Sequence, residues 1–252
     1  MNDLGFEPHA PVDAESFFTN FVREFRGELI SHRLPPSPSF DNADFYFPEW
    51  NVVTELKCLQ TDFPQLQLYQ DKFADLQKKW ISEGKMTFAM IFGNEPLPAE
   101  LRHQYIRLFR KPLQRIIEKG NKQIKETKLN LGFDIYQGLL IIINDGLYGL
   151  PTIATVALIS DILINNFSSI DGFVYLTLNR YTDIPGDDYA RLVWIPAYSS
   201  RASDSLVNFV NFLGRKWFDY LEANLGKFDS RVEISDSDIG HKIIKNAKFI
   251  DL

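Results

Sequence analysis

The sequence predicts an α/β fold in which a mixed central sheet is flanked by helices. Residues 44–59 are predicted to form two short strands joined by a turn at 48–51. Before and after this turn, successive side chains point alternately to the two faces of a strand. Residues 138–144 form an unbroken apolar run of strand length, which is typical of a buried strand. Residues 203–225 place apolar side chains at helical spacing. We expect residues 1–252 to form one domain.

The N-terminal segment is predicted to begin with an amphipathic helix over residues 11–30. Asp13 suits its N-cap, and six apolar side chains share one face of the helix. Residues 34–40 contain too many prolines for a regular strand.

Residues 60–129 are predicted to be mostly helical, so a helical insertion follows the second strand of the hairpin. One helix starts near Ala99, and Pro112 suits the start of another. Gly120 and Asn121 leave open the alternative that this second helix is interrupted.

The C-terminal half alternates between helices and strands. We expect a helix at 152–164, strands at 173–178 and 191–195, and the long helix at 203–225. The chain then divides into core motifs at 13–145, a C-terminal α/β extension at 146–228 and a tail at 229–252.

Composition excludes several classes of protein. The chain is 45% hydrophobic with 21 Phe, enough for a packed core, but it has no run of about twenty apolar residues. A single cysteine and four scattered histidines exclude a disulfide framework and a cysteine-rich zinc site. The N-terminus does not resemble a secretory signal, and phosphate-loop and nucleophile-elbow motifs are missing. We expect no membrane span and a cytoplasmic location.

Three ionisable groups are aimed at one end of the predicted hairpin. Glu55 and Lys57 share a face of their strand, and Asp44 opens the strand before it. Two carboxylates beside an amine form a plausible site for a hard cation. Glu-x-Lys occurs three times, but only here does it end a β-branched apolar strand. The alternative is a solvated Glu/Lys pair on an edge strand with an unrelated Asp nearby.

Asp44 on one strand and Glu55-Leu56-Lys57 on the next resemble the PD-(D/E)xK, or restriction-endonuclease-like, nuclease superfamily. In that family a helix carrying Gln or Lys follows, and then another core strand. Residues 122–128 fit the helix, and residues 138–146 fit the strand.

The resemblance covers residues 13–145, and its motifs are short. No proline precedes Asp44, although this position varies in the family, and a long insertion separates Glu-x-Lys from the motif helix. The resemblance implies a restriction-endonuclease-like sheet.

The resemblance also implies roles for individual residues. Asp44, Glu55 and the backbone carbonyl of Leu56 would hold Mg²⁺ or Mn²⁺. Lys57 would orient the attacking water, and Gln123 would steady the site from the helix. Many family members carry a third acid on the first helix, for which Glu24 is the candidate; the alternative is a solvated glutamate.

Positive charge is concentrated in one segment. Residues 102–128 hold nine Lys and Arg against two Glu, an excess of seven in a chain whose net charge is −6. On a helix, Arg115, Lys119, Lys122 and Lys125 fall on one side and suit a phosphate backbone. The alternative is a solvated basic face of an ordinary amphipathic helix.

Two functions remain open from the sequence. The first is a metal-dependent endonuclease, a hydrolase that cuts phosphodiester bonds with DNA as the expected substrate. The second is a catalytically inactive nuclease-like module that binds or scaffolds a prokaryotic defence or repair complex. A homodimer is an open alternative for the first, because cutting both strands of a duplex often uses a dimer.

Overall fold

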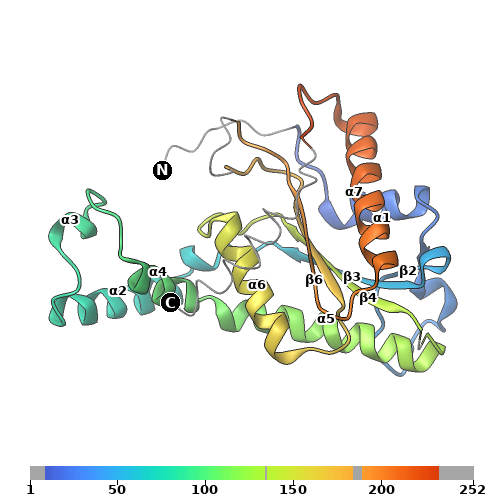
Figure 1. Ribbon diagram of the computed structural model, residues 1–252, viewed down its shortest axis with the longest axis horizontal. Helices are drawn as coiled ribbons and strands as arrows, with labels where there is room; N and C mark the ends of the chain where they lie inside the picture. The colour runs from blue at the N-terminus through green and yellow to red at the C-terminus, as the bar shows by residue number, and fades with distance from the viewer. Residues whose placement is uncertain (1–8, 134, 184–188, 233–252) are drawn as a thin grey trace.

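A six-stranded mixed sheet forms the centre of the molecule in the computed structural model, which describes residues 9–133, 135–183 and 189–232 (Figure 1). The helices and strands in chain order are α1 (Ala14–Glu24), β1 (Glu28–Leu29), β2 (Phe45–Phe47), β3 (Val52–Leu59), α2 (Gln67–Ser82), α3 (Phe88–Ile91), α4 (Ala99–Arg107), α5 (Arg110–Leu131), β4 (Gln137–Asn144), α6 (Thr152–Asn166), β5 (Gly172–Thr177), β6 (Trp194–Tyr198) and α7 (Asp204–Leu225).

The strands lie in the order of the chain, β1 to β6. β1, β2 and β3 pair antiparallel, β3, β4 and β5 pair parallel, and β6 closes the sheet antiparallel. Parallel neighbours need a crossover. Here α2 to α5 lie in the connection from β3 to β4, and α6 links β4 to β5. The predicted α/β class with a mixed central sheet is confirmed.

Each face of the sheet carries its own apolar core. Along β4, Leu140 and Ile142 pack with α5 and α6, while Leu139, Ile141 and Ile143 pack with α1 and α7. The alternation follows from the two-residue period of a strand. Because both faces are covered, β4 is an unbroken apolar run, as its sequence indicates.

The first helix is shorter than predicted. Asp13 is its N-cap, with its carboxylate accepting a hydrogen bond from the Ser16 amide at 2.7 Å. The helix ends at Glu24 instead of continuing to residue 30, because Arg26 adopts a left-handed backbone with φ of 61°. Leu29 keeps the apolar spacing of a helix but lies in β1.

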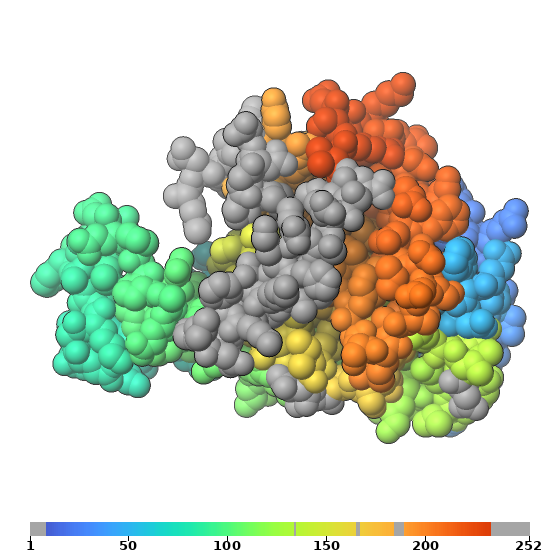
Figure 2. Space-filling model, viewed as in Figure 1, coloured from blue at the N-terminus to red at the C-terminus, as the bar shows by residue number. Residues whose placement is uncertain are grey.

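The predicted helical insertion is present as an arm, defined here as α2 to α4, that projects from the body (Figures 1 and 2). Its small core of Trp80, Met86 and Leu101 is separate from the two cores of the sheet. At its tip, Phe88 and Phe92 are 80% and 75% exposed.

The long helix α5 runs without a break through Gly120 and Asn121, so the interruption left open by the sequence does not occur. Gly120 faces the sheet and is buried. A β-carbon there would lie 3.0 Å from Leu140 Cδ1 and 3.5 Å from Glu55 Cγ. The glycine therefore lets the helix lie close against the strand that carries Glu55 and Lys57.

Residues 146–228, expected as an extension, are part of the central structure. They supply β5 and β6, and α7 packs against α1 through aromatic contacts such as Phe21 with Trp217. The predicted tail from residue 229 lies largely outside the described residues. Among the described helices, none is long and apolar enough to cross a membrane.

Candidate active site

Asp44, the residue just before β2, lies opposite Glu55 of β3. Phe45 of β2 pairs with Thr54 of β3, so one residue further along the antiparallel register Asp44 faces Glu55. One Asp44 carboxylate oxygen accepts a hydrogen bond of 2.8 Å from the Leu56 amide. The hairpin therefore brings the two acids together as the sequence predicts.

Lys57 completes the group from the same face of β3. Its ammonium donates hydrogen bonds to Glu55 Oε1 and, at 2.8 Å, to Gln123 Oε1 on α5. The Gln123 amide in turn donates to the Asn42 carbonyl at 2.9 Å. The amine is therefore held between β3 and α5, and Gln123 also ties α5 to Asn42, two residues before Asp44.

Burial perturbs both acids. It raises the pKa of Glu55 to about 8, and the negative charge of Asp44 adds to this, while Lys57 opposes it. Burial also raises the pKa of Asp44, although the Leu56 amide and Lys57 favour its charged form. Glu55 is fully buried, and its Oε2 lies without a hydrogen-bond partner unless it shares a proton with the facing Asp44 carboxyl, a contact that acts on the pKa of both acids. A buried oxygen left this way is costly unless it has another ligand.

A pocket of about 160 Å³ opens beside Asp44. Leu56 lines it together with Glu15 and Thr19 from α1. The carbonyl of a strand residue points to the same side as its own amide. Because the Leu56 amide points to Asp44, the Leu56 carbonyl is directed to this side as well.

The donor set fits a magnesium or manganese ion. Within the described ranges, no group of three or more His, Cys, Asp or Glu side chains is arranged to hold a metal. Mg²⁺, however, is usually bound through one or two carboxylates and keeps several waters or substrate phosphates. Asp44, the unpartnered Glu55 Oε2 and the Leu56 carbonyl offer such a partial oxygen shell.

The predicted third acid, Glu24, is not brought to this site. It is exposed in the last position of α1, while Glu15 of the same helix lines the pocket. Nine residues of helix separate the two, a rise of about 14 Å. Helical periodicity does not reveal which end of α1 meets Asp44, so sequence reasoning missed Glu15. Its position two residues after the N-cap Asp13 is the only local signal.

Thr127, also missed by sequence reasoning, ties the segment before Asp44 to α5. Its hydroxyl accepts a hydrogen bond of 2.7 Å from the Ala43 amide, and both residues are fully buried. This hydrogen bond helps to position Asp44, because Ala43 is the residue immediately before it.

Replacing Thr127 by valine keeps the side-chain shape but removes this acceptor. We expect the free energy of unfolding to fall by about 1–3 kcal/mol, because the buried Ala43 amide loses its partner. Urea denaturation measures the change. Thr61→Val at an exposed position is the control and should stay within about 0.5 kcal/mol of the parent. Equal stabilities of the two variants would contradict this role of Thr127.

The four predicted phosphate-binding residues are all exposed on α5 but differ in their partners. Lys122 is paired with Asp41 at 2.7 Å and with Glu126 at 3.7 Å. For Arg115, Lys119 and Lys125, the described part of the chain shows no ion pair. Lys119 is close enough to the site that its charge acts on Asp44, lowering a pKa that burial raises.

Comparisons with known proteins identify no relative from which the roles of the site residues could be transferred. No protein-family model matches the chain, and neither a curated protein nor a solved structure is detectably similar to it.

Proposed function

We propose that this chain is a metal-dependent nuclease that hydrolyses phosphodiester bonds, with DNA as the expected substrate. The observation that carries the proposal is the buried cluster of Asp44, Glu55 and Lys57, in which one carboxylate oxygen lacks a partner. Burying two acids and a lysine together is costly, and perturbed acids gathered beside an open pocket are typical of functional sites.

Each residue of the cluster has a distinct role in the proposed reaction. Asp44, Glu55 and the Leu56 carbonyl would hold Mg²⁺ or Mn²⁺. The ion would neutralise the phosphate and help to ionise a water. Lys57 would orient the water and offset the negative charge that develops in the transition state. Gln123 would keep the Lys57 ammonium in position through their 2.8 Å hydrogen bond.

The order of the elements supports the proposal. The resemblance to the PD-(D/E)xK superfamily implies an Asp that opens one strand, Glu-x-Lys on the next, a helix with Gln or Lys and then another core strand. β2, β3, α5 and β4 occur in that order, and β3 pairs parallel with β4. The helical arm falls between β3 and α5.

A cleavage assay tests the proposed function. The chain is stripped of metal with EDTA and incubated with labelled single- and double-stranded DNA and RNA. We expect at least one substrate to be cut when Mg²⁺ or Mn²⁺ is added, and none to be cut without metal. If all four substrates stay intact and a calorimetric Mn²⁺ titration gives no heat of binding, the proposal is wrong.

Glu15 is expected to support the metal from α1, because it lines the pocket beside Asp44. Glu15→Gln should weaken Mn²⁺ binding or lower the cleavage rate by about 10–100-fold, the usual effect of losing a supporting group at a metal site. Glu24→Gln removes the same charge from the other end of α1 and is the matched control. Equal effects of the two substitutions in calorimetry and in rate would argue against a role for Glu15.

The alternative, a nuclease-like binding or scaffold module, is favoured by one observation. Phe88 and Phe92 lie one helical turn apart at the tip of the arm and are 80% and 75% exposed. Exposed aromatic patches often mark contact with another protein. The Mn²⁺ titration separates the two functions, since a scaffold needs no metal. Partner binding without metal binding would support the alternative.

A further inference from the structure

Four positively charged residues follow one another at a spacing of four: Arg107 at the end of α4, then Lys111, Arg115 and Lys119 on α5. We call these four residues the basic ridge. Residues four apart form one ridge on a helix surface. The backbone stays in the helical region at Leu108, so the ridge continues across the junction of the two helices. The next position along it is Gln123, which holds Lys57.

All four residues of the basic ridge are exposed. Among the described residues, none of the four has an ion pair or a side-chain hydrogen bond. Several other surface lysines are paired, such as Lys122 with Asp41 and Lys78 with Asp75. Like charges four residues apart destabilise a helix. A row of unpaired cations therefore indicates an anionic partner with charges spaced along it.

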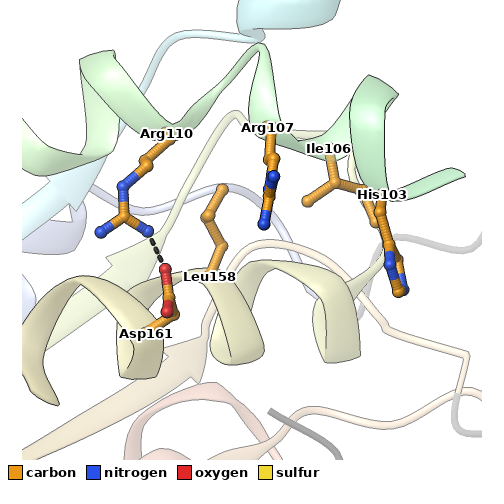
Figure 3. Close-up of a pocket in the computed structure, with 6 residues that line it drawn as sticks. All are labelled: His103, Ile106, Arg107, Arg110, Leu158 and Asp161. Carbon is orange, nitrogen blue, oxygen red and sulfur yellow. Dashed lines mark ion pairs between the residues drawn. The ribbon is translucent and has the colours of Figure 1, made fainter. Parts of the chain in front are cut away.

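The far end of the basic ridge lies at a small pocket between α4, α5 and α6. Arg107 and Arg110 both reach toward α6 there, beside His103 (Figure 3). Arg110 is paired with Asp161, which leaves the Arg107 guanidinium as the unpaired cation of the pocket. The enclosed space is about 20 Å³, room for one water-sized atom. This space is too small for a whole small molecule.

We propose that the basic ridge binds the phosphate backbone of one nucleic-acid strand and leads it across α5 from the candidate active site to Arg107. Along α5, eight residues separate Lys119 from Lys111, a rise of about 12 Å, and Arg107 lies beyond the two-residue junction with α4. At 3.4 Å per nucleotide, the α5 part alone corresponds to about three or four nucleotides on one side of the cleaved bond. The cleavage of a bond at this end of the basic ridge rests on the proposed function, but the binding of nucleic acid along the ridge does not.

This path differs from the stripe that the sequence predicts. Arg115 and Lys119 belong to both, but Arg107 and Lys111 replace Lys122 and Lys125. Lys125 is exposed like the residues of the basic ridge but lies off their four-residue spacing. Lys122 is occupied by Asp41 and Glu126, so a phosphate there would have to displace an existing partner. Arginine and lysine without such partners are free to bind phosphate.

The test compares two double variants of the full chain, Arg107→Ala/Lys111→Ala and Lys78→Ala/Lys79→Ala. Both remove two exposed cations, but Lys78 and Lys79 lie on the arm, paired with Asp75 and Glu83. The probes are fluorescein-labelled single-stranded and duplex oligonucleotides of 6 and 20 nucleotides. Binding is measured by anisotropy in EDTA over a series of salt concentrations, so neither metal nor cleavage enters the result.

The ridge variant should bind the 20-nucleotide probes about tenfold more weakly at low salt. Its log–log salt slope should fall by about 0.7 per lost contact on single strands, or about 0.9 on duplex. The 6-nucleotide probes are long enough to cover the basic ridge, so their binding should be weakened as well, and the control variant should bind like the parent. The proposed role of the basic ridge is wrong if both variants lose the same affinity, or if the ridge variant loses no affinity. If the unmodified protein binds nucleic acid but does not cleave it when metal is added, the proposed function is wrong, whereas the proposed role of the basic ridge is retained.

Discussion

Replacing Lys57 by alanine is expected to lower the cleavage rate by about 10²–10³-fold or more, the usual cost of losing one charge-stabilising donor in an active site. The substitution also removes the hydrogen-bond partner of both Glu55 Oε1 and Gln123 Oε1. Initial rates with Mg²⁺ at saturating substrate measure the loss. Lys78→Ala, which removes an exposed lysine on the arm, is the control and should keep the parental rate.

A structural role alone would not produce this pattern. Metal affinity, measured by calorimetry, should survive Lys57→Ala, because Asp44, Glu55 and the Leu56 carbonyl remain. Glu55→Ala should instead weaken metal binding and cleavage together. Cleavage that persists in both variants would show that the activity comes from a contaminant or from a different site.

The metal-free protein is expected to lose stability as the pH rises from about 4.5 to about 8. The pKa of Glu55 is raised by burial from 4.5 to about 8, so in this window the folded chain keeps a proton that the unfolded chain releases. The free energy of unfolding should therefore fall by up to about 1.4 kcal/mol per pH unit, with the full stabilisation present only below pH 4.5.

Urea denaturation in EDTA at pH 5, 6, 7 and 8 measures this dependence. Glu55→Gln cannot ionise, so its stability should change much less over the same range. Glu24→Gln, at an exposed position, should follow the parent. If the parent becomes more stable with rising pH in this window, or if Glu55→Gln keeps the parental slope, Glu55 is not the buried neutral acid inferred here.

The hairpin of the candidate site was predictable because its information is local. A period of two places Glu55 and Lys57 on one face, and a short turn brings Asp44 opposite. Gln123 was found through the family resemblance, since nothing in its own helix identifies it. The structure adds the 2.8 Å hydrogen bond that joins it to Lys57.

The predictions failed where tertiary packing decides. The spacing of Phe25 and Leu29 continues the pattern of α1, yet the chain turns at Arg26 and Leu29 joins the sheet. Gly120 is a helix breaker by intrinsic propensity. In the structure its missing side chain allows α5 to approach β3, and the helix is held by that contact. Glu15 and Glu24 are equivalent in pattern, and only the packing of α1 on the sheet distinguishes them.

The arm that separates β3 from α5 also has a consequence for folding. The Leu56–Asp44 hydrogen bond joins residues 12 apart in sequence, whereas the Lys57–Gln123 bond joins residues 66 apart. Closing the longer loop costs more chain entropy, but the cost grows only logarithmically, by about 0.6 kcal/mol for each doubling of length. The two acids can therefore meet early within a local hairpin, and the lysine is fixed later, when α5 docks. A longer arm at that position would therefore add little to the entropy cost of closing this loop.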